Sequence, residues 1–184
     1  NESSYKMINS FEDSKFQTKN ILSNSIEMQM KADVPLGMFL SGGIDSTLIT
    51  AIMQSQNKKK ISTFSVGFKD TDYDESKYST QIANYFNTNH NNIIIEPKEA
   101  LDVVSLLPEI YDEPFADSSC VPTFLLSKKV SSHVKVALSG DGGDELFGGY
   151  NRYIYLNKIL NKLKLIPFSL RKFFFKKLIL LPTE

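Results

Sequence analysis

Short apolar runs alternate along the chain with segments in which apolar side chains recur at helical spacing. Runs rich in β-branched and aromatic residues predict strands at residues 35–40, 61–68, 92–96 and 135–138. Helical spacing predicts helices at residues 13–31, 45–56, 74–86, 98–111 and 122–132, with further helical patterns from about Glu145. Pro108 leaves the end of the fourth helix open, and Pro122 fits the first turn of the fifth.

This alternation of strands and helices favours an α/β fold with a parallel, twisted sheet covered by helices on both faces. In sheets of this kind, ligands bind beyond the carboxyl ends of the strands. Two glycine-rich segments follow the predicted strands at residues 35–40 and 135–138. We therefore expect the functional site at that edge of the sheet.

Composition narrows the class of protein. The 184 residues are 41% hydrophobic and 23% charged, which is ordinary for a globular domain. The single cysteine, Cys120, excludes an internal disulfide framework and is typical of a reducing compartment. No apolar stretch has the length of a membrane span, so we expect a soluble, cytoplasmic protein without a membrane partner.

The net charge of zero conceals an asymmetry: residues 1–145 carry about −7 and residues 146–184 about +7. A basic tail can bind nucleic acid or an anionic membrane surface. Its basic residues are interleaved with Leu, Ile and Phe, which favours solvated faces of helices whose apolar faces pack on a partner element. The interleaved basic residues include Lys158, Lys162, Lys164, Arg171, Lys172, Lys176 and Lys177.

The first glycine-rich segment, Ser41-Gly42-Gly43-Ile44-Asp45-Ser46, leads directly into a predicted helix. Backbone N–H groups at such a turn and helix start can bind negatively charged oxygens, and the two serines add hydroxyl donors. Asp45 would repel phosphate unless a divalent cation lay between them, which suits a Mg²⁺ ligand. A turn with Ser and Asp as helix caps is the alternative. The segment lacks the Gly-Lys-Ser/Thr ending of a Walker loop and resembles the pyrophosphate loop of the N-type ATP pyrophosphatases.

The second segment, Ser139-Gly140-Asp141-Gly142-Gly143-Asp144-Glu145-Leu146-Phe147-Gly148-Gly149-Tyr150, places three carboxylates among five glycines. These carboxylates repel one another unless a cation or a reacting group compensates, although an exposed acidic turn is an alternative. With the first segment, this string resembles the asparagine synthetase family, which has an adenine nucleotide alpha hydrolase-like fold. The resemblance runs in collinear order over residues 16–155 and takes in 34–37, 63–68, 73–76 and 111–119. We expect a loose segment at 1–15 and, at 156–184, a basic, apolar tail that begins a further, truncated part.

The resemblance implies a role for each matching position. Ser41, Gly42, Gly43 and Ser46 would hold the phosphates of ATP, and the main chain near Leu40, Val66, Ser139 and Gly140 would hold adenosine. Asp45 and Asp144 would coordinate Mg²⁺. Asp141 stands where many family members have glutamate, the residue assigned to the ammonia-handling step.

The implied reaction has two stages: ATP activates a carboxylate as its adenylate, and ammonia then forms the amide and releases AMP. Family members carry a glutaminase domain that supplies the ammonia and a lysine well beyond the second segment; we expect both to lie outside this partial domain. Aspartate is the default substrate. The segment 111–119 has no arginine to hold its carboxylate, so another carboxylate such as a sugar acid stays open.

Two other classes of protein compete with this interpretation. A tRNA-modifying ATP pyrophosphatase would use the basic tail, but the second segment and the lack of cysteine pairs disfavour it, as they disfavour a nucleic-acid partner. A non-catalytic nucleotide-binding domain would not need both Asp45 and Asp144. Cys120 is expected to be a packed side chain rather than a nucleophile, and His90 and His133 to be structural or surface groups. A homo-oligomer stays open.

Overall fold

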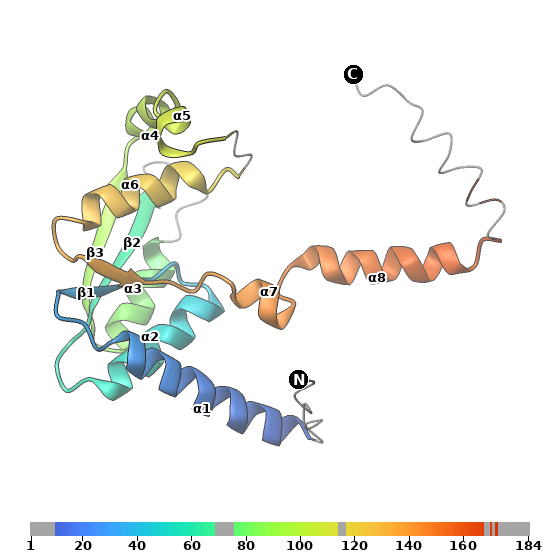
Figure 1. Cartoon of the computed structure of the whole chain (residues 1–184), viewed down its shortest axis with the longest axis horizontal. Helices are drawn as coiled ribbons and strands as arrows, with labels where there is room; N and C mark the ends of the chain where they lie inside the picture. The colour runs from blue at the N-terminus through green and yellow to red at the C-terminus, as the bar shows by residue number, and fades with distance from the viewer. Residues whose placement is uncertain (1–9, 69–75, 114–116, 168–169, 171, 173–184) are drawn as a thin grey trace. The chain divides into compact units, whose positions relative to one another are not determined.

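A computed structural model describes residues 10–68, 76–113, 117–167, 170 and 172 (Figure 1). The chain divides into two compact units, residues 1–141 and 142–184. The first unit contains four strands: β1 (Leu36–Phe39), β2 (Ser62–Phe68), β3 (Asn89–Ile95) and β4 (Val136–Leu138). All neighbouring strands pair in parallel, in the order β3-β2-β1-β4. This confirms the expected α/β class and parallel sheet.

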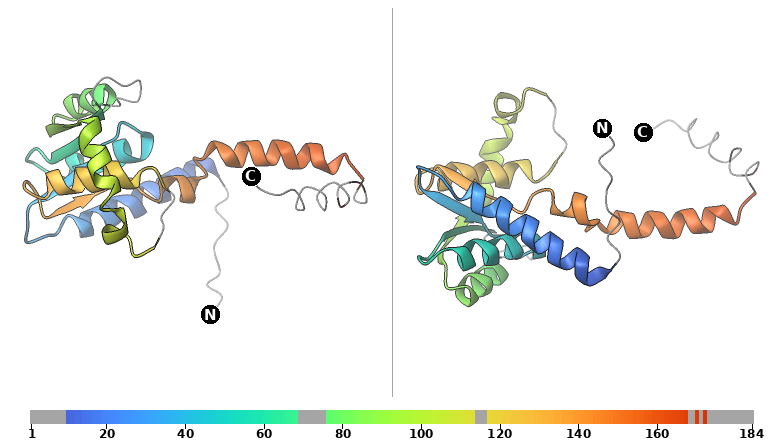
Figure 2. Two further views of the ribbon diagram at one scale, coloured as in Figure 1. Left: turned by 90° about the horizontal axis from the view of Figure 1, so that it is seen from above. Right: turned by 60° about the horizontal axis from the view of Figure 1, so that its bottom comes forward.

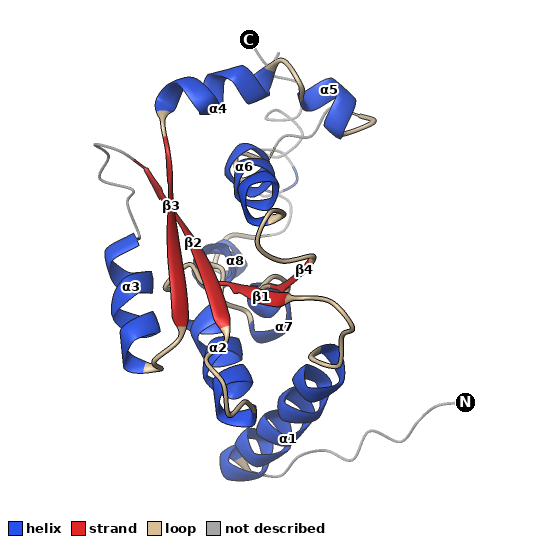
Figure 3. Cartoon of the chain, turned by 90° about the vertical axis from the view of Figure 1, so that its left-hand side faces the viewer, coloured by secondary structure: helices blue, strands red, loops and turns tan. Residues whose placement is uncertain are grey.

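Helices of the first unit cover both faces of this sheet (Figure 3). One face carries α1 (Phe11–Gln29), α2 (Ile44–Gln56) and α3 (Ser76–Tyr85), and the other carries α4 (Pro97–Val104), the short α5 (Leu107–Ile110) and α6 (Cys120–Val130). In two views, α1 packs beside α2 (Figures 1 and 2). The predicted covering of both faces is therefore confirmed.

Two apolar layers hold these helices on the sheet. Met38 of β1 is fully buried between Ile26 of α1 and Met53 of α2. On the opposite face, Phe64 of β2 packs with Val130 at the end of α6. Burial of each such side chain contributes about 1.5–3 kcal/mol, so these layers account for much of the stability of the unit.

Polar side chains fill the space between β2, β3 and α3. The buried Thr63 and Ser65 hydroxyls lie 2.9 and 3.2 Å from the two ring nitrogens of His90, and Ser65 also donates to Asn92. Burial lowers the pKa of His90 below its usual value. His90 is thus a hydrogen-bonded structural residue, as the sequence suggested.

Helix termini and one ion pair fix several elements. Ser10 caps α1 by accepting a hydrogen bond from the Asp13 N–H at 3.1 Å. Glu99 of α4 accepts a hydrogen bond from the Glu96 N–H at the start of its own helix. The Lys129 ammonium of α6 lies 2.7 Å from Glu99 and donates to the Ile94 carbonyl at 3.2 Å, and the pKa of Glu99 is lowered mainly by its bond to Lys129. These contacts tie α4, α6 and the end of β3 together.

Several boundaries differ from the sequence prediction. The helix expected at 13–31 lies two residues earlier, at Phe11–Gln29. The strand expected at 92–96 begins earlier, at Asn89, because polar residues face the hydrogen-bonded layer beneath α3. The helix expected at 98–111, whose end Pro108 left open, ends at Val104. A separate short helix begins at Leu107, with Pro108 in its first turn. The helix expected at 122–132 is displaced by two residues, to Cys120–Val130.

The second unit consists of α7 (Gly143–Phe147) and α8 (Asn151–Lys164) among its described residues. Ile154, Leu156 and Leu165 are exposed, and Lys158, Lys162 and Lys164 occupy the same helix or its end. Lys176 and Lys177 lie outside the described residues, so the expectation that the tail packs on a partner element stays a prediction. In the part of the chain that the structure describes, no helix is long and apolar enough to cross a membrane.

Candidate functional site

The candidate site lies at the point in the sheet where the strand order changes direction. The chain proceeds from β1 to β2 and β3 on one side, and then returns to place β4 on the other side of β1. Crevices at such a reversal, outside the carboxyl ends of the strands, are the usual ligand sites of α/β sheets. Residues 41–46 follow β1 and residues 139–141 follow β4, so both segments lie at this point.

The loop after β1 turns sharply at Gly42, whose φ is +94°. A side chain there would also approach α3, because an added Cβ would lie 3.0 Å from the Cβ of Tyr78 and 3.2 Å from the Ser79 nitrogen. Glycine therefore satisfies two requirements at this position, the left-handed conformation and the close packing of α3 behind the loop.

The buried hydroxyl of Ser46 holds the loop in its turn. It accepts a hydrogen bond from the Ser41 N–H at 3.3 Å, lies 3.0 Å from the Ser41 hydroxyl and donates to the Gly43 carbonyl at 3.3 Å. The Gly43 N–H in turn donates to the Ser41 hydroxyl at 3.2 Å. The two serines thus connect the end of β1 to the first turn of α2.

The first turn of α2 leaves donors available. Gly43 is the N-cap and supplies no side-chain hydrogen bond. The alternative interpretation, a turn capped by Ser and Asp side chains, is therefore wrong at this cap position. The first N–H groups of a helix have no partner inside it, and the positive end of the helix dipole lies with them. This is the arrangement that binds phosphate oxygens in other proteins.

Asp45 occupies this same first turn and is half-buried. Its carboxylate is an oxygen ligand of the kind that Mg²⁺ prefers. Next to it, the Thr47 hydroxyl donates to the Gly43 carbonyl at 2.6 Å, a contact that the sequence analysis did not identify. In the sequence, the position of Thr47 directly after Ser46 was the one indication of this contact. That position alone does not distinguish a hydroxyl bonded to the loop from a hydroxyl exposed to solvent.

The loop after β4 packs directly on the start of α2. A Cβ added to Gly140 would lie 2.8 Å from the Ser46 backbone nitrogen and 3.2 Å from the Asp45 carbonyl carbon. Such distances leave no room for a side chain. The two glycine-rich segments, far apart in sequence, are therefore in backbone contact.

Asp141 is exposed and held by Ser139. The Ser139 hydroxyl donates to the Asp141 carboxylate at 3.0 Å and accepts from the Asp141 N–H at 3.4 Å. This small ring of contacts orients the carboxylate at the carboxyl end of β4. Asp141 thus presents an exposed, oriented carboxylate.

Leu40 and Val66, whose main chain is expected to contact adenosine, lie where β1 and β2 cease to pair. The Leu40 N–H donates to the Phe64 carbonyl at 2.8 Å, the last contact in the described register between β1 and β2. Val66 lies two residues further along β2 and pairs with Ile93 of β3. Val66 therefore lies past the last residue of β2 that pairs with β1, and its main chain on that side is available to a ligand.

Asp144 belongs to the second unit, in the first turn of α7, and is half-buried. The described residues contain no group of three or more His, Cys, Asp or Glu side chains that could hold a metal ion. Mg²⁺ commonly takes only one or two protein carboxylates and completes its shell with water and phosphate oxygens. The carboxylate of Asp45 in the first unit and that of Asp144 in the second are each a ligand of this chemical type.

Tyr150, the last residue of the second segment, donates a hydrogen bond from its hydroxyl to the Glu145 carboxylate. The bond lowers the pKa of Glu145 and raises the pKa of Tyr150 to about 12. The Arg152 guanidinium carbon lies 4.0 Å from the centre of the Tyr150 ring. The sequence analysis assigned no role to these three residues.

The segment 111–119 is described on both sides of residues 114–116. Asp117 accepts a hydrogen bond from the Ser119 N–H at 2.8 Å, which lowers the pKa of Asp117. Cys120 is buried, which agrees with a packed side chain.

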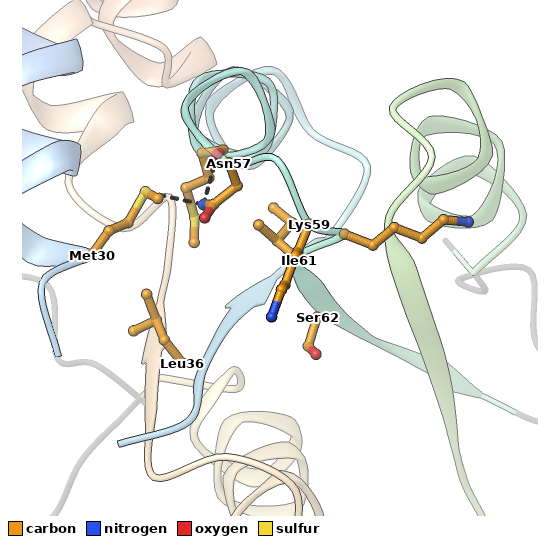
Figure 4. A pocket seen from close by; sticks show the side chains of 8 residues that line it. Met30, Leu36, Asn57, Lys59, Ile61 and Ser62 are labelled. Atoms are coloured by element: carbon orange, nitrogen blue, oxygen red, sulfur yellow. Dashed lines mark hydrogen bonds between the residues drawn. The ribbon is translucent and has the colours of Figure 1, made fainter. Parts of the chain in front are cut away.

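A cavity of about 210 Å³ lies at the opposite edge of the sheet (Figure 4). It lies among the starts of β1 and β2 and the carboxyl ends of α1 and α2, where the Asn57 amide donates to the Met53 carbonyl at 3.1 Å. The lining residues are Met30, Leu36, Met53, Asn57, Lys59, Lys60, Ile61 and Ser62. None of the residues of the glycine-rich segments lines it, so the cavity is separate from the candidate site.

Residues 17–181 match the family model of asparagine synthase, and the chain belongs to this family. A protein of Methanocaldococcus jannaschii with the provisional name asparagine synthetase 2 (glutamine-hydrolyzing) is 39% identical over 137 residues, 74% of this chain and 26% of that protein. Asparagine synthetase 1 (glutamine-hydrolyzing) of Bacillus subtilis is 35% identical over 157 residues, 85% of this chain and 24% of that protein.

The chain spans about a quarter of the length of these curated relatives. Among solved structures, the NH3-dependent NAD synthetase from Campylobacter jejuni is similar with a TM-score of 0.48 and 15% identity, over 74% of this chain and 60% of that one. That likeness is too slight to support an argument about function. The family assignment therefore depends on sequence, and the resemblance to the asparagine synthetase family expected from the two segments is confirmed.

Proposed function

We propose that this chain is the ATP-using part of an enzyme that converts a carboxylate to an amide, with aspartate as the first substrate to test and asparagine as its product. The backbone contact between Gly140 and Ser46 carries the proposal, because it brings the two family segments to one edge of the sheet. A domain with no binding or catalytic role would not need the uncapped start of α2 and the oriented carboxylate of Asp141 at the same end of the sheet.

In the first stage, the loop at residues 41–46 would bind the phosphates of ATP. The N–H groups at the start of α2 are the donors, and the paired hydroxyls of Ser41 and Ser46 hold the loop that presents them. The main chain at Leu40, Val66, Ser139 and Gly140 would contact adenosine. The substrate carboxylate would then attack the α-phosphorus, the bond to the leaving pyrophosphate would break, and an acyl-adenylate would form.

Asp45 and Asp144 would hold Mg²⁺ in this stage. When bound, the ion would neutralise charge on the pyrophosphate oxygens as they leave. Asp45 contributes from the first turn of α2, next to the N–H groups that would bind the same phosphates. Positioning and charge stabilisation of this kind supply most of the acceleration in phosphoryl-type transfers.

In the second stage, ammonia would attack the activated carbonyl. The bond to AMP would break, and a proton would pass from the nitrogen to a base. Asp141 suits that role because it is exposed and oriented by Ser139. Its side chain is one methylene shorter than glutamate, so the base would stand further from the carbonyl than in family members with glutamate.

The ammonia is proposed to come from a glutaminase domain, since both curated relatives are named as glutamine-hydrolyzing. The lone buried Cys120 also supports a reducing, cytoplasmic location. A sugar acid or another carboxylate is the alternative substrate, because residues 111–113 and 117–119 include no arginine.

The first test is calorimetric titration of the complete protein with a non-hydrolysable ATP analogue, with and without Mg²⁺. Saturable binding that Mg²⁺ strengthens is the expected result. Absence of binding by a folded sample would contradict the proposal. Release of AMP and pyrophosphate, measured over a panel of aspartate, other amino acids and sugar acids, would then identify the substrate.

The variant Asp45→Asn tests the metal assignment within the same experiment. Asparagine keeps the size of the side chain and removes the charge, so folding should persist while the Mg²⁺-dependent part of ATP binding weakens. Unaltered binding by Asp45→Asn would show that Asp45 does not hold the ion. Asp33→Asn is a matched control, since Asp33 is exposed and lies before β1, at the other end of the strand.

A further inference from the structure

The short helix α7 carries Asp144 and cannot define its own conformation. It has five residues, and both flanking glycines have positive φ, +88° at Gly142 and +67° at Gly148. A single helical turn gains too few hydrogen bonds to be stable alone. Contacts from neighbouring residues must therefore fix the direction of the Asp144 carboxylate.

One such contact comes from Gly149. Its N–H donates to the Asp144 carbonyl at 3.0 Å. A Cβ added to Gly149 would collide with the Asp144 carboxylate and would lie 3.3 Å from the Asp144 Cα. The carboxylate thus lies in the space that a side chain at position 149 would occupy, and any side chain there would turn it away.

The second contact comes from Tyr150, which reaches back over the same turn. Its hydroxyl donates to Glu145, the residue that follows Asp144. The Tyr150 ring is held from the other side by α8: the Arg152 guanidinium stacks on it, and the Tyr153 ring meets it edge to face at 5.7 Å. The ring is therefore fixed, and Glu145 is fixed through it.

From these contacts we propose that Gly149 and Tyr150 are positioning residues for Asp144. They hold α7 in the conformation in which the Asp144 carboxylate lies against Gly149, and they do not themselves touch the reacting atoms. This inference rests on the proposed function, which assigns Asp144 to Mg²⁺. It adds that residues 149 and 150 fix the orientation of the Asp144 carboxylate before Mg²⁺ binds.

The variant Tyr150→Phe removes only the hydroxyl and keeps the ring between Arg152 and Tyr153. Tyr155→Phe is the matched control, because Tyr155 is an exposed tyrosine of the same helix whose hydroxyl makes no hydrogen bond among the described contacts. Both variants are made in the complete protein. Their folding is compared by thermal unfolding before any other measurement.

The first readout is amide hydrogen exchange over residues 143–150 in the absence of Mg²⁺ and nucleotide. Loss of the bond to Glu145 should make exchange there about threefold faster or more in Tyr150→Phe, and Tyr155→Phe should match the wild type. Equal exchange in both variants and the wild type would overturn the proposal, since the hydroxyl would then not hold α7.

The second readout is the Mg²⁺ concentration that gives half-maximal AMP release. It should rise about three- to tenfold in Tyr150→Phe, with little change in the rate at saturating Mg²⁺. Glu145→Gln keeps an oxygen that accepts from Tyr150 and should stay near the wild type, whereas Glu145→Ala should behave like Tyr150→Phe. A loss of rate that saturating Mg²⁺ does not restore would overturn a positioning role.

The variant Asp144→Asn separates this inference from the proposed function. If Asp144→Asn keeps the Mg²⁺ dependence of the wild type, the metal assignment fails. If Asp144→Asn loses that dependence while Tyr150→Phe keeps it, the metal assignment stands and the positioning role fails. Gly149→Ala should reproduce the Mg²⁺ effect of Tyr150→Phe through the collision with the Asp144 carboxylate.

Discussion

Gly140 and Ser46 approach each other so closely that a Cβ on the first would lie 2.8 Å from the backbone nitrogen of the second. Gly140 follows the edge strand β4, and Ser46 lies in the first turn of α2. Their contact joins two glycine-rich segments that the sequence separates widely. It is the structural basis for treating the segments as one site.

Gly140→Ala should therefore disturb the site directly. The added methyl group meets backbone atoms of Asp45 and Ser46, which cannot move aside as a flexible side chain would. Overpacking of this kind typically costs about 1–3 kcal/mol, and we expect a lower free energy of unfolding together with weaker binding of an ATP analogue.

The control for this prediction is Gly142→Ala. An added Cβ at Gly142 meets nothing within 4 Å, but φ there is +88°, so the change tests backbone strain without a clash. Thermal unfolding and calorimetric titration measure both variants. If Gly140→Ala binds the analogue as well as the wild type, the close packing of the two loops is not required for the site.

Ser46→Ala should loosen the loop at residues 41–46. The buried hydroxyl takes part in contacts with Ser41 and Gly43, and its removal leaves the Ser41 N–H without that acceptor. We expect a loss of about 1–3 kcal/mol in the free energy of unfolding, measured in urea, and a clear loss of ATP-analogue affinity. Thr47→Val removes one contact with the same Gly43 carbonyl and should have the smaller effect on both quantities.

His90 should make the fold sensitive to acid. Burial lowers its pKa in the folded state below the usual 6.5, so the unfolded chain binds the proton more readily. The stability due to neutral His90 is complete above about pH 6.5 and is lost as the pH falls from there through the lower folded-state value. Urea unfolding at about pH 7.5 and 5.5 should show this loss in the wild type.

His90→Gln supplies the comparison, because glutamine can keep a polar contact with Thr63 or Ser65 and does not titrate. Its free energy of unfolding should change less between the two pH values than that of the wild type. Equal changes in both proteins would show that other groups, and not His90, cause the acid sensitivity.

Cys120→Ala should leave the proposed chemistry intact. The thiol is buried at the start of α6, and among the described residues it does not belong to any group that could hold a metal ion. We expect full ATP-analogue binding and AMP release, with about 1 kcal/mol lost in the free energy of unfolding. Loss of AMP release by a folded Cys120→Ala sample would instead indicate a catalytic thiol.

The spacing of apolar residues predicted most strands and helices of the fold. Each difference between a predicted and an observed boundary has a physical reason. The strand β3 was expected to be short because Asn89 and Asn91 do not look like strand residues, yet they pair with β2 over a polar layer that contains His90. The end of the helix expected at 98–111 was left open because of Pro108. That helix does end before Pro108, at Val104, and Pro108 stands in the first turn of α5, where proline is well tolerated.

The candidate site was predicted in part. Residues 41–46 were recognisable because glycine and serine types follow a strand and precede a helix, a local signal. The contact of Gly140 with Ser46 depends on the strand order, which no local pattern contains. The contacts of Gly149 and Tyr150 with α7 depend on backbone angles and side-chain directions, so a string of residue types could not indicate them.

The pairing of β1 with β4 also bears on the order in which the strands pair during folding and separate during local unfolding. It joins Leu36 to Val136, across a hundred positions of chain, and β4 contributes only three residues at the edge of the sheet. Pairs of such high sequence separation form late in folding, and short edge strands are among the first to open. The proposed nucleotide site would thus be completed last and opened first, while β1, β2 and β3 stay paired. A bound nucleotide would close that opening, so its strongest protection against amide exchange should fall on β4 and not on the longer strands.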